Sequence, residues 1–531
     1  MLAYIKDKKK YQSRDLAVGI GAGHVYSQTG QLRFRVWTNR HKSIRRHAYT
    51  TTVLTPSYRV TEQETVQGVA KAAVKDLIRL TDIGICKAGE MLVLNADGTH
   101  KNKYANSTTG PWFLDSQFDP EIAHLVEKYK IDFATVVTED SDIFSSIPGK
   151  TDKRGKGSQF ESSFNFIHHY AMRQDSHAPG FVMCIDGDLK GTDGFVYRMC
   201  LGLHKGFSYL VPLYWRYKYE GRATNHLMFP LFAAISRKVV RQPIGGEFAF
   251  DRKMLARFTE VHRWSRRWRD FGIDIGMTIT AGTSKDAIGQ VLLPRKINYV
   301  GQDARIQIGA MFVQVGRSLF NGLLDFIESN DTLEIQEVTT VPVVDIETVN
   351  HNNLEVELSD MAEVIGALGN FLNLFTSQAF QTDKDILGDF CYRIQDVYSE
   401  FEKHGIQGSI LYDLRNETKN DERQMEDILK RIQCLDNSVL LTAKEWAEIV
   451  FKCFEEFQIR RKRNEERAST TVIRNVLLCV FYLRVFSFNV QTYNLPSYPD
   501  AEDLLKEQMS EFVKIASHKL LLLEHANKIC M

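Results

Sequence analysis

The chain has few of the features that mark a nucleic-acid binder, a disulfide-stabilised secreted domain or a membrane-spanning protein. Lys and Arg number 67 against 66 Asp and Glu, so no charge excess draws it to nucleic acid or acidic membranes. Eight cysteines are scattered without a CxxC pair, which favours reduced thiols and a cytoplasmic location. The basic N-terminus is followed by no apolar stretch, so we expect no secretory signal. The longest apolar run, residues 476–483, is far shorter than the roughly 20 residues that cross a bilayer.

Internal repeats are also absent, and the sequence pattern changes once along the chain. Up to about residue 344, short apolar runs alternate with helical patterns and Gly-rich turns, which is typical of an α/β domain with a mostly parallel sheet. Beyond about residue 350, apolar residues recur at helical spacing. We therefore predict a nucleotide-binding catalytic domain over residues 1–345 and an α-helical domain over residues 346–531.

Apolar runs that end in small or acidic residues are the predicted strands. The first is residues 16–20 (LAVGI), followed after a long polar insertion by an amphipathic helix over residues 64–77. Further strands are expected within residues 91–98, 133–137 and 181–190. Because ligands of such sheets bind at the carboxyl ends of the strands, functional residues are expected there.

Two carboxylates, Asp186 and Asp188, follow an apolar strand in the sequence IDGD. Separated by one residue at a strand end, they can bind one divalent cation, Mg²⁺ or Mn²⁺, which in turn neutralises a diphosphate. A solvated acidic turn gives the same short pattern and is common in proteins. The fully apolar strand before these residues favours the metal site.

Two further motifs suit a nucleotide. Asp97 in NADG ends an apolar strand and could accept hydrogen bonds from a base or ribose, although an Asx-turn has the same pattern. RGKGS places Arg154 and Lys156 before a predicted helix start, which suits phosphate. Its spacing is not that of a Walker loop, and an exposed basic turn would look the same.

Two more carboxylates follow later in the chain. Gly245 and Gly246 permit a tight turn or the close approach of a ligand, and Glu247 stands at the end of that pair. Glu247 could bind sugar hydroxyls, take a proton from an acceptor, or simply cap a helix or pair with Arg241. Asp274 lies in the apolar stretch FGIDIGMTITAG, where a charge needs a partner, so structural and catalytic roles are both open.

The ordered motifs resemble the GT-A glycosyltransferases related to mannosylglycerate synthase and glucosyl-3-phosphoglycerate synthase. Their order along the chain is more specific than any single motif. The resemblance implies a metal-assisted, retaining hexosyltransferase that uses a GDP- or UDP-hexose and a small hydroxyl acceptor such as a glycerate-like molecule. The matching segments are NADG, RGKGS, FVMCIDGDLK, LVPLYWRYKYEGRATN, FPLFAAI, RQPIGGEFAF, FGIDIGMTITAG and IGQVLLPRK.

The resemblance also implies roles for individual residues. Asp186 and Asp188 would bind the metal and the donor diphosphate. Glu247 would lie near the donor sugar and Asp274 near the reaction centre. The residues implied to hold the donor nucleotide and its phosphates are Asp97, Lys156 and Arg154. The residues implied to bind the donor sugar or the acceptor are Gly245, Gly246, Arg222, Thr224 and Asn225.

This sequence departs from the family pattern at two places. Relatives open with a strand and a Pro-x-x-Asn-Glu type loop that contacts the base, whereas Gly21 stands where we expect that proline. Relatives also carry a histidine metal ligand where PRKIN places Asn298, a neutral and weaker ligand for manganese. Asp303 or His262 are alternative ligands.

Two other functions remain open at this stage. Nucleotidyl transfer uses a similar glycine and lysine loop with metal carboxylates, and it would release pyrophosphate from a nucleoside triphosphate. A degenerate glycosyltransferase fold that only binds its ligand is the other alternative, because of the altered first loop and Asn298. The helical part could pack on the catalytic domain, shape the acceptor site or form a homodimer contact, and the sequence does not choose among these.

Overall fold

The structure is a computed structural model in which most helices and strands of the chain are described. The described residues are 23–26, 32–38, 45, 47–57, 63–97, 120–140, 155–175, 179–214, 217–260, 268, 271–294, 297–298, 304–329, 337–345, 360–408, 411, 422–493, 495 and 498–529. The predicted first strand at residues 16–20, together with Gly21, Arg154, His262 and Asp303, lies outside them.

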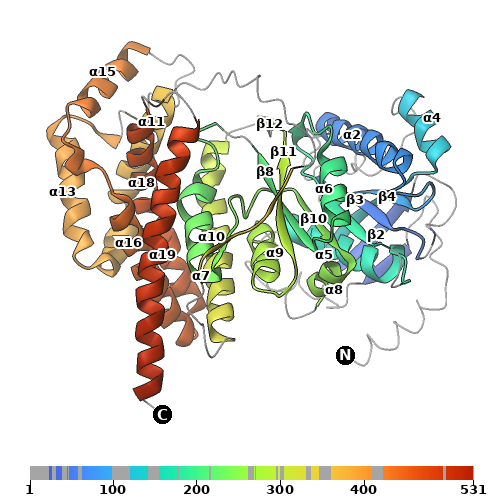
Figure 1. Ribbon diagram of the computed structural model, residues 1–531. Helices are drawn as coiled ribbons and strands as arrows, with labels where there is room; N and C mark the ends of the chain where they lie inside the picture. The colour runs from blue at the N-terminus through green and yellow to red at the C-terminus, as the bar shows by residue number, and fades with distance from the viewer. Residues whose placement is uncertain are drawn as a thin grey trace. The chain divides into compact units, whose positions relative to one another are not determined.

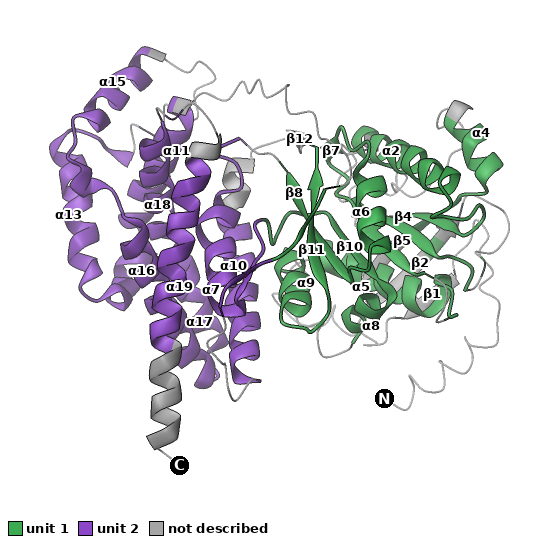
Figure 2. Cartoon of the chain, in the orientation of Figure 1, with its two compact units in different colours: residues 1–215, 242–304, 341–352 green, residues 216–241, 305–340, 353–531 purple. Residues whose placement is uncertain are grey.

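The chain forms two compact units, each built from several stretches of sequence (Figure 2). Unit 1 comprises residues 1–215, 242–304 and 341–352, and unit 2 comprises residues 216–241, 305–340 and 353–531. This division differs from the single boundary expected at residue 345. Two segments of the first 345 residues pack with the helices of unit 2, and the chain then returns to the sheet of unit 1 as strand β14 (Val343–Val344).

Unit 1 is built around a sheet of ten described strands in the order β1-β2-β5-β4-β3-β6-β10-β8-β11-β14. The central strands β5, β4, β3 and β6 pair in parallel, while β10 runs antiparallel to both of its neighbours. The predicted α/β class with a mostly parallel sheet is therefore confirmed. The remaining strand bounds are β1 Gly23–Tyr26, β2 Leu32–Thr38, β3 Thr51–Ser57, β4 Met91–Asp97, β5 Asp132–Asp140, β6 Phe181–Cys184, β8 Tyr209–Tyr214, β10 Phe248–Asp251 and β11 Ile288–Leu293.

Helices cover both faces of this sheet (Figure 1). On one face, α2 (Gln63–Asp82) buries Val66, Val69, Ala73 and Leu77, an apolar stripe at helical spacing, in one core with α6 (Phe195–His204). Helix α4 (Pro120–Tyr129) adds to that layer. The other face carries α5 (Lys156–Phe166) and α8 (Arg252–Phe258), joined through aromatic rings such as Phe164 of α5 against β10. Helix α9 (Ile273–Gly282) lies on this second side as well, since Thr278 hydrogen-bonds the Tyr209 hydroxyl at 3.1 Å.

Strand β3 occupies the central position that the sequence assigned to residues 16–20. It pairs in parallel with both β4 and β6, and α2 follows it directly along the chain. The strand preceding that amphipathic helix is therefore Thr51–Ser57, with Pro56 at its end. Gly21, where we expected the family's proline, lies outside the described residues, and its comparison with that proline stays a prediction.

Unit 2 is mainly helical, as predicted for the C-terminal part. Helix α18 is enclosed by its neighbours, and helix α16 begins with a capping box in which Thr442 and Glu445 bond reciprocally. The main helices are α7 Phe229–Ser236, α10 Ala304–Glu328, α11 Asp360–Phe375, α12 Gln378–Asp383, α13 Phe390–Lys403, α15 Glu422–Gln433, α16 Ala443–Lys462, α17 Glu466–Thr471, α18 Leu478–Thr492 and α19 Tyr498–Ile529. A short parallel pair joins β9 (Lys238–Val239) to β13 (Thr339–Thr340).

Unit 2 contains one long apolar helical stretch. Among the described residues, Glu466–Thr492 is long and apolar enough to match a membrane span by length and composition, with a mean hydropathy of 1.6 in its most apolar window. That window is 83% buried inside the structure. Such burial is what a core helix of a helical bundle shows.

Candidate active site

The IDGD segment lies at the carboxyl edge of the parallel strands. It follows β6, and Asp186 is partly exposed while Asp188 is exposed. Gly187 between them packs so closely on the Pro56 carbonyl oxygen that a Cβ there would collide with it. The two carboxylates therefore lie beside the end of β3, where α2 begins.

Lys156, the first residue of α5, joins the carboxylates of two distant segments. Its Nζ lies 2.8 Å from Asp186 Oδ1 and 3.1 Å from Asp274 Oδ1. The side chains are 12%, 20% and 13% exposed respectively, so this contact is largely shielded from solvent. The Asp274 charge thus has the partner that its apolar sequence context requires. These ion pairs hold the ammonium group between the two carboxylates.

The turn of Gly245, Gly246 and Glu247 lies at the same edge of the sheet. Glu247 precedes β10, whose first residue, Phe248, is the register partner of Cys184 at the end of β6. Gly246 has a φ of 98°, a backbone conformation that favours glycine. The Lys156 ammonium lies 3.5 Å from the Gly246 carbonyl oxygen, so this turn and the two aspartates meet at one lysine.

The neighbouring residues fix the main chain of this turn. The Thr278 hydroxyl donates to the Pro243 carbonyl at 2.7 Å, and the Gln242 amide donates to the Tyr214 carbonyl at 2.8 Å. A Cβ on Gly245 would collide with the Pro212 ring, so only glycine fits there without rearrangement. The turn is therefore set by contacts with β8 and α9 as well as by its own sequence.

The Tyr214 hydroxyl, at the end of β8, contacts two groups of the turn. It lies 2.6 Å from the Gly245 carbonyl oxygen and hydrogen-bonds Glu247 Oε2. Glu247 and Tyr214 are 0% and 2% exposed. Sequence reasoning did not single out Tyr214, because a tyrosine ending an apolar strand is indistinguishable from a core residue.

Cys184 lies beside these charged groups. Burial raises the pKa of the Cys184 thiol well above its usual value, and the surrounding carboxylates raise it further. Lys156 lowers the pKa of this thiol. The carboxylates that raise it belong to Asp274, Asp186 and Glu247. The thiol is therefore neutral and packs as a small apolar group at the base of the site.

Asp97 ends β4 at the same edge and is fully buried. Its register partner is Ser57, the last residue of β3, and the Ser57 hydroxyl donates to Asn95 Oδ1 at 2.9 Å. These polar side chains lie at the carboxyl ends of β3 and β4. The predicted nucleotide residue thus lies on the strand adjacent to β3, which in turn adjoins β6.

Asp186 and Asp188 carry carboxylate oxygens, the kind of ligand that a hard divalent cation prefers. Asn298 of β12 (Ile297–Asn298) pairs through its main chain with Leu189 of β7 (Leu189–Lys190), which directly follows Asp188. In the described part of the chain, no group of three or more His, Cys, Asp or Glu side chains is placed to hold a metal ion. The carboxylates of Asp186 and Asp188 suit a cation such as Mg²⁺, which takes one or two protein carboxylates and completes its shell with water and phosphate.

The predicted acceptor residues belong to unit 2. Arg222 forms an ion pair with Glu363 of α11. The Asn225 side-chain amide makes two hydrogen bonds within the protein. Its Nδ2 donates to the Glu220 carbonyl at 3.0 Å, and its Oδ1 accepts from Arg241 at 3.0 Å. Thr224 is buried beside it. These contacts organise the segment within unit 2, whereas the aspartates and the glycine turn belong to unit 1.

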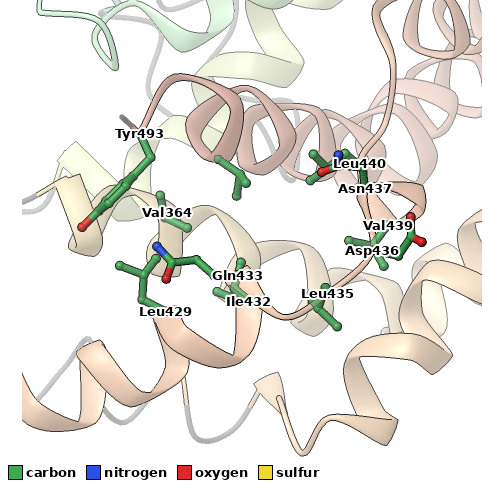
Figure 3. A pocket seen from close by; sticks show the side chains of 11 residues that line it. Val364, Leu429, Ile432, Gln433, Leu435, Asp436, Asn437, Val439, Leu440 and Tyr493 are labelled. Atoms are coloured by element: carbon green, nitrogen blue, oxygen red, sulfur yellow. The ribbon is translucent and has the colours of Figure 1, made fainter. Parts of the chain in front are cut away.

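Unit 2 also contains a cavity of about 180 Å³ (Figure 3). None of the residues predicted from the sequence to bind donor, acceptor or metal lines it. Its lining mixes aliphatic with polar side chains from Val364, Leu429, Ile432, Gln433, Leu435, Asp436, Asn437, Val439, Leu440, Val490 and Tyr493.

Solved structures similar to this chain include glucosyl-3-phosphoglycerate synthase of Mycobacterium tuberculosis. Its complex with Mn²⁺, uridine diphosphate and phosphoglyceric acid is 21% identical, with a TM-score of 0.33, over 52% of this chain and 78% of that one. The complex with Mn²⁺, UDP-glucose and phosphoglyceric acid is 20% identical, with a TM-score of 0.32, over 52% and 80%. No family model matches the sequence, and no curated protein is similar enough to match. At this identity and TM-score, the likeness is no basis for assigning an activity.

Proposed function

We propose that the chain is a glycosyltransferase that moves a hexose from a nucleotide-diphosphate sugar to a small hydroxyl-bearing acceptor, with retention of anomeric configuration. The observation that carries this proposal is the meeting of Asp186, Asp274 and the Gly246 carbonyl at one lysine, Lys156. Motifs far apart in the sequence thereby assemble at one edge of the sheet. Their order along the chain is that of the GT-A enzymes described above.

The donor diphosphate is the ligand that this arrangement suits. Asp186 and Asp188 would hold Mg²⁺ or Mn²⁺, with Asn298 as a further oxygen ligand. The cation supplies positive charge that neutralises the diphosphate as the glycosidic bond breaks. Lys156 would exchange one of its carboxylate partners for a phosphate oxygen and add a second positive charge. Arg154 belongs to the same proposed phosphate site.

The nucleotide and the sugar would lie on either side of this diphosphate. Asp97, on the strand beside β3, would accept hydrogen bonds from the base or ribose. Glu247 and Asp274 would lie beside the donor sugar and the reaction centre. Binding in this way orients the reacting atoms and removes part of the entropic barrier to transfer.

The acceptor would bind through the segment of Arg222, Thr224 and Asn225. The Asn225 amide already has partners at both ends, so it would act by shaping the segment. Of these three residues, Arg222 could exchange its ion-pair partner Glu363 for an anionic acceptor such as a glycerate.

A panel of UDP- and GDP-hexoses, measured by thermal shift with and without Mn²⁺ or Mg²⁺, tests this function. A donor at about 100 times its dissociation constant should stabilise the protein by roughly 2.7 kcal/mol. An Asp186→Asn, Asp188→Asn double variant should lose the metal-dependent part of that shift. The product mixture should contain a nucleoside diphosphate and a glycoside whose NMR coupling shows retention.

Other outcomes of the same assay would identify another function. Release of pyrophosphate from a nucleoside triphosphate would identify a nucleotidyltransferase and exclude sugar transfer. Donor binding without turnover for any acceptor would identify a binding protein that keeps the fold without the reaction. An inverted product would require a carboxylate base, for which Glu247 and Asp274 are the candidates.

A further inference from the structure

We propose that the Glu363 carboxylate of α11 occupies the place at Arg222 where the carboxylate of an acidic acceptor binds, so that such an acceptor binds by displacing it. Glu363 is then an internal competitor of the acceptor. The identification of the displacing molecule as an acceptor rests on the proposed function. The competition between Glu363 and a free carboxylate does not.

The ion pair of Arg222 and Glu363 joins two distant segments of unit 2 and is largely shielded from solvent. The two side chains are 18% and 14% exposed. A guanidinium in such a place has lost most of its hydration, so leaving it without an anion costs free energy. Glu363 supplies that anion from within the protein. Any small carboxylate that binds Arg222 must replace it.

Both main chains that carry this ion pair are fixed to one residue of α18, Asn489. The Tyr219 hydroxyl, close to Arg222 in the sequence, donates to the Asn489 carbonyl at 3.2 Å. The Asn489 side chain donates in turn to the Glu363 carbonyl at 3.1 Å. The ion pair can therefore open by rotation of the Glu363 side chain while both main chains stay in place.

The segment that carries Arg222 is held at further points. Gln508 of α19 donates to the Asn225 carbonyl at 3.0 Å. The Lys218 ammonium lies 3.0–3.4 Å from the carbonyl oxygens of Thr492, Tyr493 and Leu495. An arginine on such a segment is already positioned, so a carboxylate that binds it meets little ordering cost.

This competition favours one chemical class of acceptor. A carboxylate tethered beside the arginine acts at an effective concentration on the order of millimolar or more. A free acid can match it, because it forms the same charge-assisted hydrogen bonds to Arg222. A neutral hydroxyl compound cannot, since it brings no charge to replace that of Glu363. The ion pair thereby selects acidic acceptors, at a cost in their affinity.

Titration calorimetry without a donor tests the competition, with D-glycerate as the probe and glycerol as its neutral counterpart. Glu363→Gln should bind D-glycerate about tenfold more tightly than the wild type, as expected if Glu363 occupies Arg222 in about nine of ten molecules. Its affinity for glycerol should not change. D-glycerate binding that is unchanged or weaker in Glu363→Gln would overturn the proposal, because a purely structural ion pair gives that result.

Three further variants make this result specific. Arg222→Met should lose D-glycerate binding with either residue at position 363. Glu466→Gln removes a carboxylate from another ion pair of unit 2, with Arg317, and should leave D-glycerate affinity unchanged. An equal gain in Glu466→Gln would show a general charge effect and contradict the proposal. Glu363→Asp, with a shorter reach to Arg222, should bind about threefold more tightly than the wild type and serves if Glu363→Gln does not fold.

Stability should change in the opposite direction from affinity. Without ligand, Glu363→Gln should unfold at a lower temperature than the wild type, because Arg222 has lost its anion. Saturating D-glycerate should raise the unfolding midpoint of this variant more than that of the wild type. An equal rise in both proteins would contradict the competition.

Transfer assays separate this inference from the proposed function. Tighter D-glycerate binding by Glu363→Gln in a protein that transfers no hexose would support the competition and refute the transferase. An active transferase whose acceptor affinity does not respond to Glu363→Gln would refute the competition alone.

Discussion

Lys156 Nζ lies 2.8 Å from Asp186 Oδ1, so the first residue of helix α5 contacts the segment that follows strand β6. The same ammonium pairs with Asp274 on α9. One cation therefore balances two carboxylates that would otherwise repel each other in a largely shielded site.

Removing the Lys156 ammonium group should destabilise the donor-free protein. We expect Lys156→Met to lower the free energy of unfolding by about 1–3 kcal/mol, because two neighbouring carboxylates lose their shared partner. The cost should be smaller in an Asp274→Asn background, where one of the charges is already gone. Urea denaturation of the four proteins in this double-mutant cycle measures the coupling. Additive losses would show that the two side chains do not interact.

Metal affinity should rise when an imidazole replaces the Asn298 amide. The main chain of Asn298 pairs with Leu189 next to Asp188, so a ligand at position 298 is close in register to the carboxylates of the proposed metal site. Nitrogen ligands suit Mn²⁺ better than a neutral amide oxygen, and we expect Asn298→His to bind it on the order of tenfold more tightly. Titration calorimetry with Mn²⁺ checks this. Unchanged affinity would place the side chain outside the metal site.

Acid-dependent stability should arise from Asp76 of α2. Burial raises the pKa of this carboxyl to about 6, although it accepts hydrogen bonds from the amides of Gly194 and Tyr197 at the start of α6. The folded state therefore takes up a proton more readily than the unfolded chain. The stabilisation is fully present below about pH 4 and is lost as the pH rises through about 6.

Asp76→Asn measures this effect, because the side-chain amide does not titrate and keeps an acceptor oxygen for one of the two α6 amides. A shift of about two pKa units corresponds to about 3 kcal/mol. The stability of the wild type relative to Asp76→Asn should therefore fall by up to that amount between pH 4 and pH 7. Denaturant unfolding at several pH values gives the difference. A constant difference across the range would contradict the raised pKa.

The turn beside the proposed donor sugar should tolerate no side chain at Gly245. A methyl group there would collide with the Pro212 ring and lie 3.1 Å from the Tyr214 hydroxyl. We expect Gly245→Ala to destabilise the protein by about 1–3 kcal/mol and to weaken donor binding. Gly68→Ala in α2 is the matched control, since nothing lies within 4 Å of its added Cβ. That change should be neutral or should stabilise the helix by up to about 1 kcal/mol.

The predicted helices and strands of the central region came from local patterns. Apolar runs identified β4, β5 and β6, and helical spacing identified α2, because burial of one face imposes those periods on the sequence. Strand β3 was not predicted, because its sequence TTVLTPS is rich in Thr and Ser and is not an apolar run. Its parallel pairing with β4 and β6, a long-range contact, makes it a central strand of the sheet.

The sequence by itself determined the α/β class, the helical C-terminal part and the residue types of the candidate site. Hydrophobic period and glycine placement are local properties, and a close pair of carboxylates is visible in the chain. Tertiary structure alone decided which groups become neighbours: Lys156 with Asp274, and Tyr214 with Glu247. Such pairs depend on how distant segments meet at one edge of the sheet, and no local pattern encodes the partner of a charge.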